Sequence, residues 1–259
     1  MRAIQIIIHF TVLPYRFCGG MKIGWFSFGV SSFIACYIER ETIDRYVAIC
    51  LPEDQHEDSM RFLHDCEKVL GKKIELIRSD KYQSLDQVIE KRRCMNTVHG
   101  APCCTLLKKE VRTAYEKLHP GRHVYVWGYD VTERKRAERL FQTIPEHDHV
   151  FPLIEHNLTK EDCHGILERV DFLPRRPSVY DLGFPNNNCL GCVKQGKSSW
   201  MLTKEHFPDI FWKRAKQERE IGNSCLNGVF LDELHLEDPV DLSVRPQTQR
   251  TFFETLLFL

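Results

Sequence analysis

The chain has 259 residues, of which 42% are hydrophobic and 28% charged, and its 36 Lys and Arg balance its 36 Asp and Glu. This composition is that of a globular protein long enough to bury a core without disulfides. A net charge of zero argues against a general nucleic-acid coat and against a charged disordered tail. No run of eighteen apolar residues occurs, which argues against a membrane partner.

Strand-like and helix-like segments alternate between residues 21 and 235. Short apolar runs predict strands at 23–27, 46–51, 73–78 and 123–128. Periodicity near 3.6 residues predicts helices at 31–40, 58–70, 85–93, 105–118, 132–143 and 160–170. Gly71 is the expected C-cap of the second helix and Thr159 the expected N-cap of the last. The alternation predicts one α/β domain: a twisted, mostly parallel sheet with helices on both faces and a ligand at the strand carboxyl ends.

The two ends differ from this middle part. An apolar run near the start lacks a small-residue cleavage site, and Met21 directly precedes the first predicted strand. We therefore interpret residues 1–20 as an upstream extension outside the fold rather than as a secretory signal. Residues 236–259 form an atypical tail with a terminal apolar run, for which a docking strand and an altered reading frame both account.

The turn from the first strand into the first helix is the first candidate site. It reads Ser-Phe-Gly-Val-Ser-Ser over residues 27–32. Small residues let backbone N–H groups approach an anion, the helix dipole favours negative charge, and hydroxyls add donors. Phosphate binding through Ser27, Gly29, Ser31 and Ser32 is one interpretation, and a tight turn with a serine cap is the other.

Eleven cysteines are many for this length, and an odd number cannot all form disulfides. They favour a reducing, cytoplasmic location. Two pairs stand out, Cys103-Cys104 and Cys189-x-x-Cys192. Four thiolates can hold a tetrahedral zinc ion or a [4Fe–4S] cluster, and adjacent cysteines mildly favour the cluster because neighbouring side chains diverge. Two unrelated thiol pairs and a redox C-x-x-C remain as alternatives.

A basic helix follows the strand at 123–128. Its Arg136 and Arg139 offer guanidinium forks that suit phosphate or sulfate oxygens. Glu133 and Glu138 equally fit a solvated helix face. Lys108, in the helix after the cysteine pair, could likewise contact phosphate or sulfate oxygens or lie on a solvated helix face.

Taken in order, four segments resemble the phosphoadenosine-phosphosulfate (PAPS) reductase family of the PP-loop adenine nucleotide alpha hydrolase-like superfamily. Residues 25–32 resemble its PP-loop, residues 128–139 its strand-then-arginine segment, residues 151–162 its Pro-Leu segment, and residues 182–192 its late C-x-x-C element. The similarity covers about residues 22–235 and is greatest to compact members from bacteriophages and mobile elements. Residues 100–109 resemble the double-cysteine segment of assimilatory adenylyl-sulfate reductases.

The resemblance implies a Rossmann-like, nucleotide-binding enzyme of sulfur metabolism. Its substrate would be adenylyl sulfate, phosphoadenylyl sulfate or ATP, with a thiol electron donor for the reductive reaction. It implies a [4Fe–4S] cluster, with zinc as the alternative, on Cys103, Cys104, Cys189 and Cys192.

Two positions depart from the family pattern. Phe28 stands where many members have Gly, and no C-terminal Glu-Cys-Gly segment supplies the nucleophile of an oxidoreductase. Cys225 is then the one thiol we can nominate as that nucleophile. The alternatives are an adenylating sulfurtransferase, which splits ATP to pyrophosphate and can act on nucleic acid, and a degenerate nucleotide-binding or zinc module.

Overall fold

The computed structural model describes residues 20–97, 99–226 and 228–235. Nearly all of the predicted upstream extension and the whole predicted tail lie outside these residues. Five strands form one sheet in which every neighbouring pair is parallel, in the order β3-β2-β1-β4-β5. The strands are β1 Lys22–Phe26, β2 Arg45–Ile49, β3 Ile74–Ile77, β4 Val124–Val126 and β5 Asp148–Val150.

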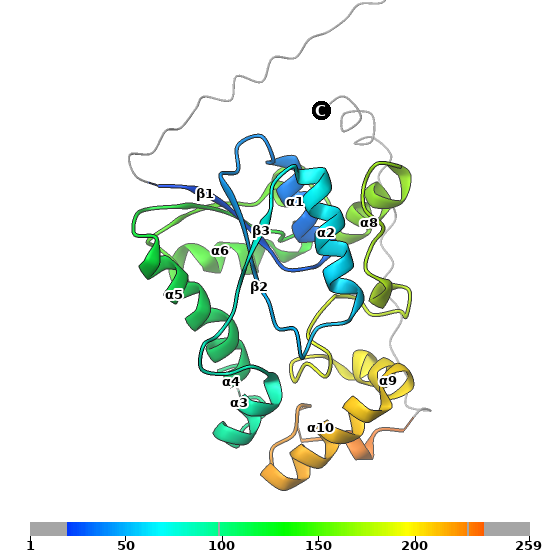
Figure 1. Cartoon of the computed structure of the whole chain (residues 1–259). Helices are drawn as coiled ribbons and strands as arrows, with labels where there is room; N and C mark the ends of the chain where they lie inside the picture. Colours follow the sequence, from blue (N-terminus) through cyan, green and yellow to red (C-terminus); the bar gives the residue numbers. More distant parts are fainter. Residues whose placement is uncertain (1–19, 98, 227, 236–259) are drawn as a thin grey trace, which may run out of the picture.

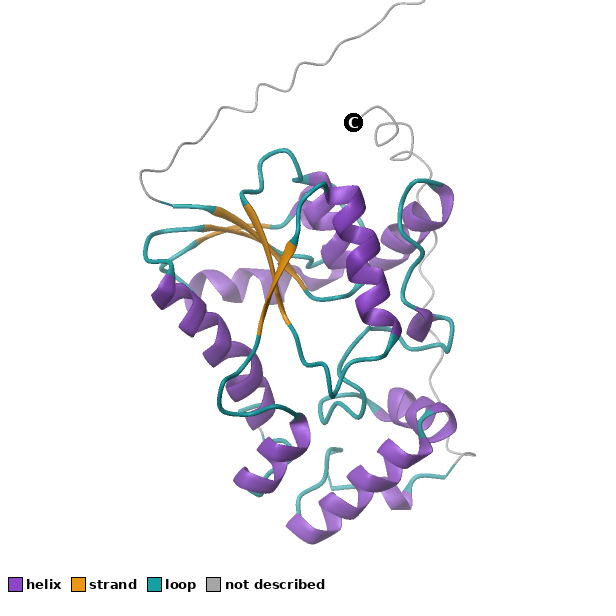
Figure 2. Ribbon diagram, viewed as in Figure 1, coloured by secondary structure: helices purple, strands orange, loops and turns teal. Residues whose placement is uncertain are grey.

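Helices connect the strands and extend beyond the last one. The α-helices are α1 Val30–Ile38, α2 Asp58–Leu70, α3 Leu85–Arg92, α4 Pro102–Cys104, α5 Glu110–Leu118, α6 Arg134–Thr143, α7 Pro152–Glu155, α8 Lys160–Arg169, α9 Lys197–His206 and α10 Pro208–Ile221. A π-helical segment, η1 Thr105–Lys109, joins α4 to α5, and three short 3-10 helices are η2 Val131–Glu133, η3 Ser178–Tyr180 and η4 Leu231–Glu233. Figure 2 shows the twist of the sheet against these helices.

The sheet buries both of its faces because its side chains alternate along each strand. Phe26, Tyr46 and Ala48 face a core that includes side chains of α1, α2 and α8. Trp25 and Val47 face a second core with side chains of α5 and α6 on its far side. Figure 1 shows the two helix groups on opposite sides of the sheet. The predicted α/β class, with helices on both faces, is confirmed.

A third core lies beyond the carboxyl ends of β2 and β3, among α3, α4, α9 and α10 (Figure 1). It contains Leu51 from the end of the β2 segment, Trp200 of α9 and Phe211 of α10, all buried. Cys103 and Cys189 belong to the same cluster. The cysteine pairs are thus built into a small helical layer that covers one end of the sheet.

Several local predictions agree with the structure. Gly71 takes the left-handed backbone (φ +65°) at the end of α2, and the Thr159 hydroxyl accepts a hydrogen bond from Asp162 N–H at the start of α8. The predicted set lacks β5, α9 and α10, and it also lacks the short helices α4, α7, η3 and η4. The predicted helix 105–118 begins with the π-helical segment, a deviation that often occurs at functional sites.

Candidate functional site

The strand order creates a switch point between β1 and β4. From β1 the chain moves to β2 and β3 on one side, and later from β4 to β5 on the other. The connections after β1 and β4 therefore leave the sheet in opposite directions, and parallel sheets bind ligands in the crevice that this opens at the carboxyl ends. The first connection is the Ser27–Ser32 loop, and the second begins at Gly128. The structure places the predicted phosphate loop at this switch point.

The loop holds its shape through hydrogen bonds between its backbone and the Ser32 hydroxyl. Ser27 N–H donates to Ser32 Oγ at 3.0 Å, and Ser32 Oγ donates to Gly29 O at 2.8 Å. Phe28 has a left-handed backbone (φ +61°), and its ring is buried beside Phe26 with 5.5 Å between ring centroids. Phe28 therefore adopts the backbone that glycine favours while its side chain points into the core, away from the loop's polar face. Gly29 gives α1 no side-chain cap, which leaves the helix N-terminus to other partners.

The two connections at the switch point touch without a gap. A Cβ placed on Gly128 would lie 2.5 Å from Ser32 Cα and 2.6 Å from Ser32 N. Real Cβ atoms do not approach backbone this closely, so only glycine fits at position 128. This contact fixes the segment after β4 against the first turn of α1.

Two residues from distant parts of the chain complete the loop. Val30 N–H, at the start of α1, donates to Tyr180 Oη at 3.4 Å, and Asn187 Nδ2 donates to Phe28 O at 2.8 Å. Burial raises the pKa of Tyr180, so its hydroxyl stays protonated. The phenol oxygen thus lies at the helix N-terminus, where an anionic ligand atom would be favoured.

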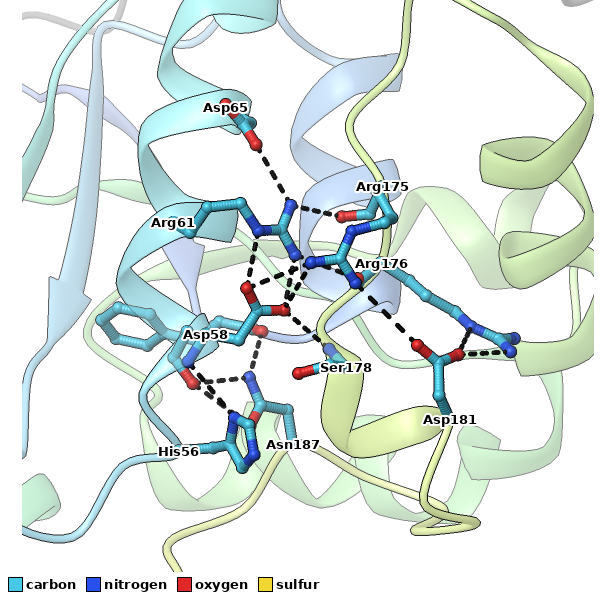
Figure 3. A network of polar contacts seen from close by, with 11 residues as sticks. His56, Asp58, Arg61, Asp65, Arg175, Arg176, Ser178, Asp181 and Asn187 are labelled. Carbon is cyan, nitrogen blue, oxygen red and sulfur yellow. Dashed lines mark hydrogen bonds and ion pairs between the residues drawn. The ribbon is translucent and has the colours of Figure 1, made fainter.

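A charged network anchors the segment that carries Tyr180 (Figure 3). Asp58, at the start of α2, accepts from Arg61 Nε and Nη2 at 2.7 Å each, from Ser178 N–H at 2.7 Å and from Arg175 Nη2 at 3.2 Å. Arg61 also donates to the carbonyl oxygens of Arg175 and Arg176. The Arg61 hydrogen bonds hold the pKa of Asp58 well below its usual range. Asp58 is thus an ionised bridge between α2 and the 175–178 segment.

The structure brings the four predicted cysteine ligands into one neighbourhood. Cys103 and Cys189 are buried, and Cys104 and Cys192 are partly buried against the same core. The Cys103 thiol shares a hydrogen bond with Cys104, which raises the pKa of Cys103 and lowers that of Cys104. The thiols of the C-x-x-C also raise the pKa of Cys103, so all four sulfurs interact electrostatically.

Lysines surround this thiol group. The pKa of Lys108 is raised, chiefly by Cys189 and then by the other three thiols. Lys108, Lys194 and Lys109 lower the pKa of Cys104 after its hydrogen bond with Cys103. Lys108 and Lys109 lie in the π-helical segment directly after the cysteine pair. The lysines thus help to favour a thiolate at Cys104, whereas burial raises the pKa of Cys189 to about 11 and also raises the pKa of Cys192. A bound metal would supply the positive charge that keeps these buried sulfurs deprotonated.

Four cysteine thiolates can hold either a zinc ion or a [4Fe–4S] cluster. Tetrahedral zinc with Zn–S bonds of about 2.3 Å needs sulfur atoms about 3.8 Å apart. Among the described residues, the one group of three His, Cys, Asp or Glu ligand atoms lying mutually within 4.8 Å is Glu116, Glu146 and His147. The four sulfurs are not part of that group. Four cysteine thiolates are a donor set for a [4Fe–4S] cluster as well as for zinc, so the residue types fit either group.

The Glu116 group lies at the opposite, amino-terminal end of β4 and β5 and is occupied by internal contacts. Glu116 accepts from Tyr125 Oη at 3.0 Å and pairs with Arg112 at 3.0 Å, and His147 Nδ1 accepts His123 N–H at 3.1 Å. The guanidinium competes with any cation. The group therefore reads as a buried polar network rather than a metal centre.

One segment connects the phosphate loop to the thiol group. Asn187 contacts the loop, and Cys189 is two residues further on. Leu190 N–H donates to Asp54 O at 2.6 Å, which attaches the C-x-x-C turn to the connection after β2. Burial raises the pKa of the Asp54 carboxyl to about 6. The two predicted sites are therefore neighbours at the same end of the sheet.

Arg136 and Arg139 have their recorded partners on their own helix and its approach. Arg136 pairs with Glu133 at 2.6 Å and lies over the Tyr129 ring at 4.9 Å, while Arg139 Nε donates to Lys135 O at 3.2 Å. Both side chains are exposed. These contacts fit the solvated helix face, and a role toward a nucleotide stays a prediction.

Cys225 lies inside the third core, 6% exposed. Burial, with the nearby Glu218 carboxylate, raises the pKa of its thiol well above the usual range. A thiolate is the attacking form of cysteine, so this environment works against nucleophilic attack by Cys225. Its proposed catalytic role stays a prediction.

Sequence reasoning missed Asp58, Tyr180 and Asn187. Their roles depend on contacts more than 100 residues apart along the chain, such as Asp58 with Ser178 and Phe28 with Asn187. Only Gly128, between a strand and a polar segment, carried a local signal of close approach.

Comparisons with known proteins show a likeness of fold. No protein-family model matches the sequence, and no curated protein matches it. Among solved structures the chain is similar to the crystal structure of phosphoadenylyl-sulfate (PAPS) reductase from Candida auris in its phosphate complex. The two are 13% identical with a TM-score of 0.47, and the match covers 67% of this chain and 82% of the other. Within the described residues, no helix is both long and apolar enough to span a membrane.

Proposed function

We propose that the protein is an adenine-nucleotide-binding enzyme that acts on an adenylyl sulfate-type substrate or on ATP. The observation that carries the proposal is the coincidence of two sites at one end of the sheet. The Ser27–Ser32 loop lies at the switch point, and four interacting thiols lie beyond the same strand ends. The resemblance of both segments to the PAPS reductase family implies a nucleotide at the first site and an iron–sulfur group at the second.

The loop would bind the phosphates through backbone N–H groups at the start of α1 and through Ser27 and Ser31, which face away from the core. Ser32 and Gly128 would keep the loop in shape, since their contacts are to backbone. The outer oxygens of the substrate would meet the lysines around Cys104. Bound there, a [4Fe–4S] cluster would supply electrostatic and redox tuning.

The burial of Cys225 favours the second candidate function. An adenylating sulfurtransferase splits ATP between its α and β phosphates, releases pyrophosphate and leaves AMP on the acceptor, so it needs no C-terminal cysteine nucleophile. A sulfonucleotide reductase needs an exposed thiolate, and Cys225 is buried.

The test uses the full chain purified without oxygen. Calorimetric titration with ATP and with adenylyl sulfate should show saturable binding, with GTP as the comparison. Ser32→Ala should weaken the binding at least tenfold because the loop loses both hydrogen bonds, whereas Ser198→Ala, on the exposed face of α9, should not. Pyrophosphate release from ATP would identify the adenylating reaction, and sulfite release from adenylyl sulfate with a thiol donor the reductive one. The proposal would be refuted if neither ATP nor adenylyl sulfate bound.

A further inference from the structure

Arg214 of α10 is a buried charge with unused hydrogen-bonding capacity. Its side chain is 3% exposed, and its Nε is buried without a hydrogen-bond partner. Burial of a guanidinium is costly unless its donors are satisfied. The contacts of Arg214 within the protein do not explain why a guanidinium is buried with its Nε–H unsatisfied.

The side of the Arg214 guanidinium that carries Nε faces the C-x-x-C turn. A Cβ placed on Gly191 would lie 3.4 Å from Arg214 Nη2 and 3.6 Å from Arg214 Nε. Gly191 stands between Cys189 and Cys192, and its left-handed backbone (φ +64°) makes the turn. The guanidinium therefore packs directly on the segment that carries two of the four thiols.

The opposite edge of Arg214 is neutralised only in part. Its Nη1 donates to Asp86 Oδ1 at 2.9 Å and to Gln217 Oε1 at 2.5 Å. Lys213 pairs with the same Asp86 carboxylate, so two cations share one anion. The nearby Glu218 carboxylate accepts two backbone N–H groups, from Cys225 and Leu231. Among the described residues, no carboxylate pairs with the edge that faces the turn.

We propose that Arg214 supplies positive charge and an Nε–H donor to the iron–sulfur group held at the Cys189–Cys192 turn. Reduction adds one electron and so one negative charge to such a group. A buried cation beside it stabilises the reduced form, because net charge and hydrogen bonds to sulfur set the reduction potential. The inference rests on the proposed function, since it needs the iron–sulfur group.

The test is a redox titration of the full chain, purified without oxygen and followed by electron paramagnetic resonance, after iron and sulfide have been counted. Arg214→Gln removes the charge, while Asp86 keeps Lys213 as a partner. At a fixed solution potential, the ratio of reduced to oxidised cluster in Arg214→Gln should fall about tenfold. This corresponds to a reduction potential lowered by about 59 mV for a one-electron couple. Asp86→Asn leaves Arg214 less neutralised, and its ratio should rise. Arg219→Gln, which removes an exposed α10 arginine paired with Asp232, should leave the ratio unchanged.

The opposite signs separate this role from a structural one, because loosening of the layer would move both variants in the same direction. Unchanged ratios in Arg214→Gln and Asp86→Asn, or shifts of equal sign, would overturn the inference while leaving the proposed function intact. If Arg214→Gln does not retain iron, the sign of the Asp86→Asn shift decides alone. A wild-type chain without iron and sulfide would overturn both the inference and the cluster on which it rests.

Discussion

The phosphate loop and the thiol group stand at the same end of the sheet but are stabilised differently. The loop is complete as it stands: its serine hydrogen bonds, the buried Phe28 ring and the Gly128 contact all lie within the protein. The thiol group consists of four interacting sulfurs with surrounding lysines and a buried arginine whose Nε lacks a hydrogen-bond partner. A preformed backbone site and a site that needs its bound group should therefore respond differently to mutation.

The largest effect is expected at the thiol group. Cys189→Ser removes one ligand, and the protein should lose the bound metal together with the folding energy that the metal supplies. A group whose Kd lies a thousand-fold below its free concentration stabilises the folded protein by about 4 kcal/mol. Losing that stabilisation lowers Tm by about 10 °C in a chain of this size. Metal analysis and thermal unfolding measure both changes. Cys94→Ser, at a partly exposed cysteine outside the group, is the control, and equal metal content in the two variants would remove Cys189 from the site.

The loop should respond through packing instead. Gly128→Ala places a methyl group 2.5 Å from Ser32 Cα and should destabilise the protein by about 3 kcal/mol, with weaker nucleotide binding but unchanged metal content. Gly196→Ala has open space for its methyl group and should cost less than about 1 kcal/mol. Urea unfolding compares the two variants. A Gly128→Ala protein as stable as Gly196→Ala would contradict the close contact at the switch point.

The anchor at Asp58 holds the segment that carries Tyr180 against α2, and it gives a pH dependence. Its folded-state pKa is depressed, so its stabilisation is present above the unfolded pKa of about 4 and is lost as pH falls below that value. Asp58→Asn should cost about 2 kcal/mol at pH 7, the range for hydrogen bonds to a charged group, and the difference from wild type should shrink toward pH 2. Asp65→Asn, at a more exposed carboxylate of α2, should cost less than about 1 kcal/mol. A pH-independent Asp58→Asn difference in urea unfolding would contradict the ionised bridge.

The smallest effect is expected at Tyr180. Its phenol oxygen takes Val30 N–H through a long 3.4 Å contact, at a position that suits a phosphate oxygen. Tyr180→Phe removes this competitor, so the nucleotide should bind about threefold more tightly, with Tm changed by less than about 2 °C. Calorimetric titration measures the affinity. Weaker binding in the variant would mean that the hydroxyl contacts the ligand instead of competing with it.

The sequence predicted the fold where the local pattern is strong and missed it where packing decides. Four of the strands lie in short apolar runs, and these runs were sufficient to predict them. The runs begin near Ile23, Tyr46, Ile74 and Val124. Strand β5 has only three residues, Asp148–Val150, and two of them are polar. Helices α9 and α10 bury Trp200 and Phe211 in a core formed with distant cysteines, which no local window contains.

The candidate site divides in the same way. The loop residues and both cysteine pairs stand in short segments with recognisable chemistry, and the structure brings these segments to one end of the sheet. Tyr180, Asn187 and Arg214 act through contacts across the fold, and their surroundings in sequence do not distinguish them from ordinary polar residues. At Phe28 the sequence shows a departure from the family pattern, since many members have Gly there. The structure shows that Phe28 nevertheless adopts the left-handed backbone that glycine favours.

We propose that the four cysteines hold an iron–sulfur group beside a preformed nucleotide loop. The most direct measurement is the content of iron, acid-labile sulfide and zinc in the full chain purified without oxygen. The account predicts about four irons and four sulfides per chain, as in a [4Fe–4S] cluster. Stoichiometric zinc without sulfide, or a folded protein without metal, would contradict it.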